Sequence, residues 1–272
     1  MRPIKIFFTL FVFLLLFNPA WAKQTKGSWI TAKSFVVMDI DDGRVLYCRR
    51  PYLKLAPAST TKVMTAMVVL ENSRLDKPVT ISKKAAAIEP SKAYLTEGAT
   101  YTTYELLQAL LISSANDAAV ALAESIAGSE ENFARLMNKK AKALGMRYTH
   151  FVNASGLPDK KRRQYSTAYD LALLMRYALR NKIFDRIIST KSAVISGSDG
   201  KRIYLTNHNK LLKTQPKFIV GKTGYTLEAK HCFLGADYGV RKNIVFSILY
   251  SRNPWQDIKR LAVYGLRLEK KK

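Results

Sequence analysis

The stretch PASTTKVMTAMVVL, residues 57–70, holds the first helix that the sequence predicts, with a serine and a lysine at its start. The proline ends an extended segment, and apolar residues then recur every three to four positions, as on the buried face of a helix. Ser59 lies in the first turn and Lys62 one turn later on the same face, so the amine can reach the hydroxyl. Serine is a weak nucleophile, and a lysine whose pKa is lowered by burial can act as its base. The pattern therefore predicts a nucleophile and its base.

The spacing Ser-x-x-Lys alone is not specific, because residues 198–201 (SDGK) match it too. That second copy lies in a glycine-rich stretch between two expected strands, residues 192–196 and 202–206, and is interpreted as a hairpin loop. The helical context therefore distinguishes Ser59 and Lys62 from the second copy.

A second candidate pair, Ser114 and Asn116, lies in the break between helices predicted over residues 102–112 and 117–127. A serine and an amide at such a break can relay a proton and hold a substrate carbonyl. Residues 251–253 (SRN) share the Ser-x-Asn pattern, and ordinary capping of the second helix is the structural alternative. The pair is a candidate only in combination with other motifs.

The third motif, Lys222-Thr223-Gly224 followed by Tyr225, occurs once, in a stretch predicted to be extended. A lysine and a hydroxyl at a strand edge can bind a carboxylate, and a glycine lets a peptide lie close to the backbone. An edge lysine with a turn glycine is the structural alternative. Together, in this order and each in the expected local structure, the three motifs predict an enzyme that forms an acyl intermediate on serine.

Strands are expected at both ends of the chain, and helices fill the middle, about residues 63–190. Such a chain closes most simply when the terminal strands join in one antiparallel sheet with the helices beside it, an α+β fold. The expected strands are residues 34–50 as a hairpin, 192–196, 202–206, 217–223, 231–238 and 243–251. The expected helices are the one starting at residue 59, then 102–112 with Thr103 as cap, 117–127, 131–144, 167–181 with Thr167 as cap, and 254–265.

The N-terminus has the layout of a secretory signal peptide, residues 1–22. Two basic residues precede an apolar run, residues 6–17, that is too short to span a bilayer. An Ala-Trp-Ala sequence ending at residue 22 then places small side chains where signal peptidase cleaves. We therefore expect an exported protein, periplasmic or otherwise extracytoplasmic.

The chain carries 45 Lys and Arg against 20 Asp and Glu, a net charge of +25, of which +23 remains once the two basic residues of the signal are removed. Such an excess attracts polyanions, and for an exported protein we expect loose contact with anionic lipid head groups or wall polymers. No nucleic-acid-binding signature is present, so nucleic acid is not an expected partner. The three histidines and two cysteines show no metal-ligand spacing, and no metal or other cofactor is expected. Basic clusters such as residues 160–163 and 270–272 are interpreted as solvated surface.

In its three motifs the chain resembles the serine D-Ala-D-Ala carboxypeptidases, low-molecular-mass penicillin-binding proteins of the peptidase S11 type, which are related to class A β-lactamases. The resemblance covers about residues 33–268 and implies a β-lactamase/transpeptidase-like fold, with the helical region inserted into the sheet. Well-known relatives carry a second, β-rich domain and an amphipathic C-terminal anchor, whereas residues 23–272 here are expected to hold the catalytic domain alone. The further similar segments are Pro57-Ala58, Asp117-Ala118, residues 128–145, Ser155-Gly156-Leu157, Ser166-Thr167-Ala168 and residues 209–212.

The resemblance implies that the enzyme removes the terminal D-Ala from peptidoglycan stem pentapeptides through an acyl-enzyme on Ser59. Lys62 is the implied general base, and Ser114 shuttles the proton to the leaving amine. The amides of Ser59 and Tyr225 form the implied oxyanion hole, and β-lactams are the implied covalent inhibitors. The implied substrate-binding residues are Asn116 for the peptide backbone, Lys222 and Thr223 for the terminal carboxylate, and Gly224 and Tyr225 along the strand.

Three alternatives are considered. A class A β-lactamase needs a glutamate to activate the deacylating water, but residues 150–175 contain none, so penicillin is expected to acylate the serine and leave slowly. A D,D-endopeptidase that cleaves peptidoglycan cross-links uses the same residues, and the sequence leaves it open. A non-catalytic wall-binding protein of the same fold would need no nucleophile, and the complete set of motif residues argues against it.

The resemblance also bears on the two cysteines. In the family, the strands that hold Cys48 and Cys232 are separated by others. Neighbouring strands lie about 4.7–4.9 Å apart, too far for a disulfide across two or three of them. We expect two free thiols.

Overall fold

The computed structural model describes residues 29–214, 219–239 and 243–267 of the 272-residue chain. The signal peptide expected over residues 1–22 lies outside the described residues. Within the described ranges, no helix is both long enough and apolar enough to cross a membrane.

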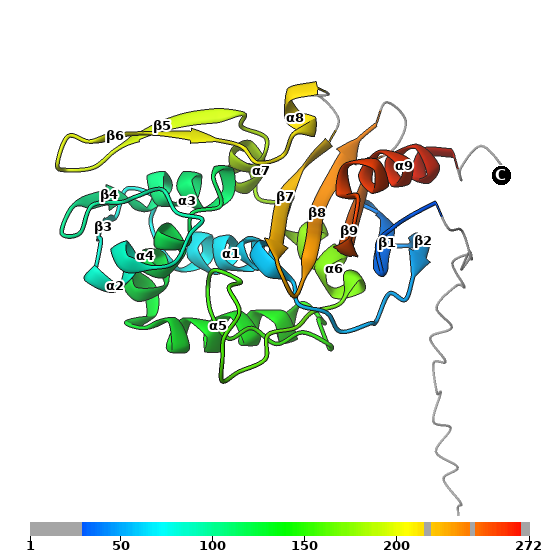
Figure 1. The fold of residues 1–272 in the computed structure, drawn as a ribbon, viewed down its shortest axis with the longest axis horizontal. Coiled ribbons are helices and arrows are strands. Elements are labelled where there is room, and N and C mark those ends of the chain that lie inside the picture. Colours follow the sequence, from blue (N-terminus) through cyan, green and yellow to red (C-terminus); the bar gives the residue numbers. More distant parts are fainter. Residues whose placement is uncertain (1–28, 215–218, 240–242, 268–272) are drawn as a thin grey trace, which may run out of the picture.

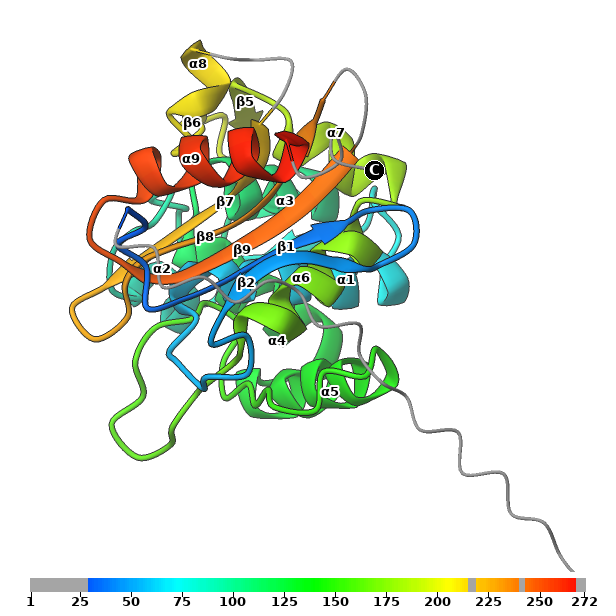
Figure 2. The ribbon, with the colours of Figure 1, turned by 90° about the vertical axis from the view of Figure 1, so that its right-hand side faces the viewer.

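A five-stranded antiparallel sheet joins the two ends of the chain, as the sequence predicted (Figures 1 and 2). The strand order is β2-β1-β9-β8-β7, so the N-terminal hairpin pairs directly with the last strand of the chain. The α+β fold class is thereby confirmed. The strands are β1 Ser34–Asp39, β2 Val45–Arg49, β7 Ile219–Thr226, β8 Lys230–Tyr238 and β9 Asn243–Ser251.

Both faces of this sheet are covered by helices. Successive residues of a strand point to opposite faces. In β1, Val36 and Met38 therefore join the core shared with the helical region, whereas Phe35 and Val37 join a second core beneath helix α9 (Pro254–Arg267). Figure 2 shows α9 lying across one face of the sheet, with helices of the middle region behind the other.

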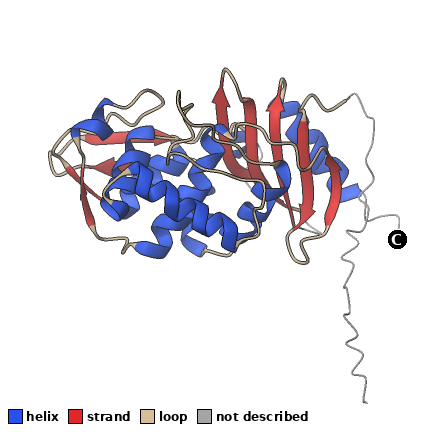
Figure 3. Ribbon diagram, turned by 90° about the horizontal axis from the view of Figure 1, so that it is seen from below, coloured by secondary structure: helices blue, strands red, loops and turns tan. Residues whose placement is uncertain are grey.

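The helical region is built around α1 (Lys62–Asn72), which packs against α3, α4, α5 and α6. Figure 3 shows these helices gathered beside the large sheet. The remaining helices are the 3-10 turn η1 Ala58–Thr61, α2 Lys83–Ala87, α3 Thr103–Ile112, α4 Asn116–Ala127, α5 Glu130–Ala143, α6 Ala168–Ala178, α7 Lys182–Ile188 and α8 Leu211–Thr214. Two small antiparallel sheets flank the region, β3 Pro78–Thr80 with β4 Thr100–Thr102, and β5 Ser192–Ser196 with β6 Arg202–Thr206.

Two local expectations about helix ends were wrong. Helix α3 is capped by Thr102, not Thr103, because the Thr102 hydroxyl accepts from the amide of Glu105 while the Glu105 carboxylate accepts from the amide of Thr102. The helix expected over residues 167–181 is capped by Thr167 as predicted but ends early. Asn181 starts α7 by accepting from two amides of its first turn.

The strand arrangement separates the two cysteines. Cys48 lies on β2 and Cys232 on β8, with β1 and β9 between them, and both are buried free thiols. The expected separation is confirmed.

The second copies of the Ser-x-x-Lys and Ser-x-Asn sequences have structural roles in the fold. Residues 198–201 form the turn of the β5–β6 hairpin, as expected. Ser251, from the second Ser-x-Asn sequence, donates to the carboxylate of the fully buried Asp257, which also accepts from the amide and hydroxyl of Thr31. Asp257 therefore ties the start of the described chain to β9 and α9.

Replacing Asp257 by alanine should lower the free energy of unfolding by roughly 2–4 kcal/mol, because the buried hydroxyls and amide that it satisfies lose their acceptor. Urea unfolding followed by circular dichroism measures this. Asp76→Ala, which removes an exposed ion pair with Arg74, is the control and should leave the midpoint almost unchanged. Equal midpoints for the two variants would contradict the role given to Asp257.

Candidate active site

Ser59 sits on a turn that is clamped between two backbone segments. Its neighbour Ala58 has a φ of 48°, an uncommon value for a residue with a side chain. A Cβ on Gly156 would lie 2.0 Å from the carbonyl oxygen of Ala58, and one on Gly224 would lie 2.9 Å from the amide nitrogen of Ser59. Only glycine lets strand β7 and the loop at residue 156 approach this closely, so these contacts fix the position of the serine.

Lys62 lies beneath the serine and is fully buried. Its Nζ lies 3.0 Å from Ser59 Oγ, 2.7 Å from Asn116 Oδ1 and 2.6 Å from the carbonyl oxygen of Ser155. Burial lowers the pKa of Lys62 well below its ordinary value, and the nearby charge of Lys222 lowers that pKa further. The amine therefore sheds its proton more readily than a surface lysine and lies within reach of the serine hydroxyl.

Lys222 is a second buried lysine, and it joins the sheet to the helical region. Its Nζ donates to Ser114 Oγ at 2.8 Å and to the carbonyl oxygen of Thr223 at 3.0 Å. Burial lowers the pKa of Lys222 to about 7. Ser114 occupies the break between α3 and α4 with a φ of 62°, which turns its hydroxyl toward the lysine. Ser114 is therefore hydrogen-bonded to an amine, that of Lys222, which can gain or lose a proton near neutral pH.

Asn116 connects the first lysine to the wall of the site. Its amide oxygen accepts from Lys62, and its nitrogen donates to the carbonyl oxygen of Glu89 at 3.0 Å. Asp117, the next residue, accepts from the amides of Ala93 and Leu95 and so holds the segment that follows Glu89. The first turn of α4 thus positions both the Lys62 amine and one rim of the site.

A cleft of about 480 Å³ opens over these groups. Six of the eight residues predicted for the site line it, whereas Lys62 and Lys222 lie behind its wall. The described residues that line the cleft include no Asp or Glu. The six are Ser59, Ser114, Asn116, Thr223, Gly224 and Tyr225.

His208 also lines the cleft and was missed by sequence reasoning. Burial lowers its pKa to about 4, and the charges of Lys222 and Lys62 act in the same direction. Its imidazole is therefore neutral at physiological pH. No spacing rule could have found it, because an isolated histidine has no pattern. The sequence gives one hint of its role: His208 directly precedes residues 209–212, one of the segments that resemble the carboxypeptidase family.

The arrangement suits nucleophilic catalysis. Within the described part of the chain, no cluster of three or more His, Cys, Asp or Glu side chains could hold a metal ion. The serine hydroxyl has an amine beside it, the Ser114 hydroxyl lines the cleft with Lys222 bonded to it from behind, and the backbone of β7 lies against the serine amide. Such a site can transfer an acyl group to serine and bind an anion next to it.

Comparison with known proteins agrees with this geometry. The Peptidase S11 family, described as D-alanyl-D-alanine carboxypeptidase, matches residues 21–249. The chain is 39% identical over 231 residues to D-alanyl-D-alanine carboxypeptidase DacF of Bacillus subtilis, a match that covers 81% of this chain and 59% of that protein. It is 33% identical over 210 residues to D-alanyl-D-alanine endopeptidase of Pseudomonas aeruginosa, covering 75% and 66% of the two chains. The crystal structure of D-alanyl-D-alanine carboxypeptidase from Mycobacterium tuberculosis superposes with a TM-score of 0.84 at 31% identity, covering 91% of this chain and 95% of that one.

The lowered pKa of Lys222 predicts how stability changes with pH. The folded protein releases this proton near pH 7, whereas the unfolded chain holds it up to its ordinary pKa of 10.5. Between these values the unfolded state binds more protons, so the free energy of unfolding should rise with pH, by at most about 1.4 kcal/mol per pH unit. Removing the group in Lys222→Met should flatten this rise.

Urea unfolding of both proteins between pH 6 and pH 10 tests the prediction. The difference between the two curves cancels the groups that titrate alike in both proteins, and a packing change at the substituted site shifts this difference by a constant without changing its slope. Parallel curves across this range would show that Lys222 keeps its ordinary pKa in the folded protein.

Proposed function

The chain belongs to the D-alanyl-D-alanine carboxypeptidase family, peptidase S11, and we propose that it is an exported serine carboxypeptidase that removes the terminal D-Ala from peptidoglycan stem pentapeptides. The observation that carries the proposal is the 3.0 Å contact between Lys62 Nζ and Ser59 Oγ, with the lysine buried and its pKa lowered. A buried lysine with a lowered pKa can serve as a general base. The chain spans 59% of the length of the Bacillus subtilis relative.

In the acylation step, Ser59 Oγ attacks the carbonyl carbon of the penultimate D-Ala while Lys62 takes the hydroxyl proton. The negative charge that develops on the carbonyl oxygen is stabilised by the amides of Ser59 and Tyr225. This role is supported by the close approach of β7 to the serine turn at Gly224. Loss of one such donor costs about 3–4 kcal/mol of transition-state stabilisation in other acyl enzymes.

The leaving group needs a proton, and the Ser114–Lys222 pair can supply it. Ser114 Oγ passes its proton to the amine of the departing D-Ala and is reprotonated by Lys222, to which it is already hydrogen-bonded at 2.8 Å. The terminal carboxylate of the substrate lies beside Thr223, which lines the cleft, and the charge of Lys222 attracts it from behind the wall. Asn116 borders the peptide backbone. Water then releases the acyl-enzyme.

Purified muropeptides test the proposal directly. Incubation with the mature protein should convert pentapeptides to tetrapeptides, as measured by mass spectrometry. Ser59→Ala should lower the rate by at least about a thousandfold, because the nucleophile is lost. Lys62→Met should lower it by about 10²–10⁴-fold, the usual contribution of a general base.

Other products would change the assignment. The second candidate function is a D,D-endopeptidase, which the similarity to the Pseudomonas aeruginosa endopeptidase supports. Cleavage of cross-linked dimers with little pentapeptide trimming would favour it. No change in either pool would favour a non-catalytic wall-binding protein and overturn the mechanism.

Penicillin labelling is a second readout of the same site. We propose that β-lactams acylate Ser59 and leave slowly, since no acidic side chain among the described residues lines the cleft to activate water. Intact-mass spectrometry should detect a long-lived adduct on the wild type and none on Ser59→Ala. Rapid turnover of penicillin would contradict this.

The excess of basic residues supports a further part of the proposal, loose electrostatic contact with anionic membranes or wall polymers outside the cytoplasm. Cosedimentation with vesicles that contain anionic lipid should therefore be strong at low ionic strength and largely lost at about 0.5 M salt, where charges are screened within a few ångströms. Neutral vesicles are the control. Binding that does not respond to salt would rule out an electrostatic contact.

A further inference from the structure

A basic loop, residues 157–164, borders the catalytic cleft. It lines a second cavity of about 280 Å³, together with residues at the end of β7. Gly156, Leu157 and Thr226 line both this cavity and the catalytic cleft, so the two spaces adjoin. A ligand that extends out of the cleft past Thr226 therefore meets the basic loop.

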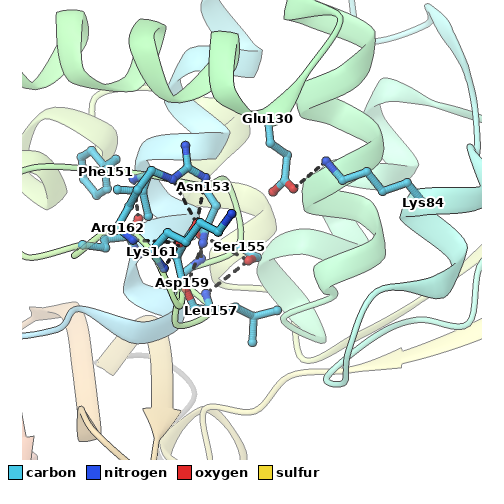
Figure 4. A network of polar contacts seen from close by, with 12 residues as sticks. Lys84, Glu130, Phe151, Asn153, Ser155, Leu157, Asp159, Lys161 and Arg162 are labelled. Carbon is cyan, nitrogen blue, oxygen red and sulfur yellow. Dashed lines mark hydrogen bonds and ion pairs between the residues drawn. The ribbon is translucent and has the colours of Figure 1, made fainter.

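Internal hydrogen bonds give this loop a defined shape. Asp159 accepts from the amides of Lys161 and Arg162 and pairs with the Arg162 guanidinium at 2.8 Å (Figure 4). At the end of the loop, Gln164 accepts from the amide of Val152 and donates to Thr61, a residue of the serine turn. The loop is thus anchored to the turn that carries the nucleophile.

Three of the four basic residues in this loop form no ion pair with the part of the chain that the structure describes. Arg162 is engaged by Asp159, but no carboxylate of the described residues forms an ion pair with Lys160, Lys161 or Arg163. All three are exposed and line the second cavity. Nearby Glu130 is paired with Lys84 at 3.2 Å, as Figure 4 shows.

One further acidic residue, Glu228, lines the same cavity and offsets part of its charge. Four basic side chains still face two acidic ones there, so the cavity carries an excess of positive charge. Because it is concave and adjoins the cleft, it suits a flexible anionic chain better than a flat membrane surface.

The direction of β7 indicates which part of a substrate reaches this cavity. Within β7 the chain passes from Lys222 to Thr226, where the strand ends, and Ser59 lies against the strand at Gly224. If the terminal carboxylate lies at Thr223 and the reacting carbonyl at Ser59, the remainder of the peptide must continue toward Thr226 and Glu228. That end of the strand is where the basic loop lies.

We propose that Lys160, Lys161 and Arg163 bind carboxylates of the acyl-donor peptide upstream of its D-Ala-D-Ala end, so that this enzyme prefers acidic stem peptides over neutral ones. The proposal rests on the proposed function, because the direction of the peptide follows from it. A carboxylate is attracted by several lysine and arginine side chains at once without requiring one fixed geometry.

Binding to a catalytically inert protein tests the proposal without relying on turnover. The protein is the Ser59→Ala variant, and the probes are two fluorescent peptides that end in D-Ala-D-Ala, one with a free upstream glutamate carboxylate and one with that carboxylate amidated. The acidic peptide should bind about tenfold more tightly, which corresponds to about 1.4 kcal/mol. Replacing Lys160, Lys161 and Arg163 by Gln should remove most of this preference, and 0.5 M salt should do the same.

A matched control separates local contacts from the overall charge. Lys142, Lys182 and Lys191 are exposed and line neither cavity, so their replacement by Gln removes the same charge elsewhere. This variant should keep the tenfold preference. Arg162 stays unchanged in both variants because its pair with Asp159 shapes the loop.

The outcomes distinguish failure of this inference from failure of the proposed function. Equal binding of both peptides to the parent, or an equal loss of preference in the two triple variants, would overturn the role of the loop and leave the carboxypeptidase assignment standing. Binding of neither peptide would overturn both. Loss of vesicle binding in the loop variant, with the peptide preference intact, would assign the loop to the membrane surface and overturn the inference as well. In the otherwise wild-type enzyme, the loop variant should lower kcat/KM for the acidic peptide alone.

Discussion

The active site contains two buried lysines, Lys62 and Lys222. Neither amine has an ion-pair partner among the described residues, so hydrogen bonds must stabilise both of them. Removing a charged amine from water costs several kcal/mol unless hydrogen bonds replace its solvation. Lys62 receives three such bonds and Lys222 two. Burial still lowers both pKa values, which suits Lys62 to the base role proposed for it and lets Lys222 exchange a proton near pH 7.

The rest of the fold holds the groups that these amines contact. Ser59 comes from the turn η1 and Lys62 from the first turn of α1. Ser114 lies in the break before α4, Asn116 lies in the first turn of α4, and Lys222 comes from the sheet. The antiparallel sheet brings β7 against the serine turn, and glycine at 156 and 224 removes the side chains that would keep these segments apart. A small shift of either segment would therefore change the contact between Lys62 and Ser59.

The charges around the site are separated in a way that fits its proposed chemistry. The cleft itself is lined by no acidic residue among those described, which leaves an attacking water without a carboxylate base. The adjoining cavity carries an excess of basic side chains on a loop that is anchored to the serine turn through Gln164 and Thr61. In the proposed function, the cleft holds the reacting bond and the adjoining cavity meets the remainder of the peptide.

Local sequence was sufficient for much of this protein. Hydrophobic periodicity and turn residues identified the five strands of the large sheet and its main helices, and the three motifs named eight residues that the fold brings to one site. Errors arose where two neighbouring residues could serve equally, as at Thr102 and Thr103, or where a helix was interrupted at Asn181.

Tertiary structure decided the rest, because those properties depend on groups far apart in the chain. The pKa of Lys62 depends on burial by the whole helical region and on Lys222, 160 residues away by their numbering. The neutral state of His208, the structural role of Ser251 and the position of the basic loop beside the cleft likewise arise from contacts that no local pattern contains. Sequence spacing specifies which groups one turn of helix can bring together, whereas solvation and the meeting of distant segments exist only once the sheet has closed.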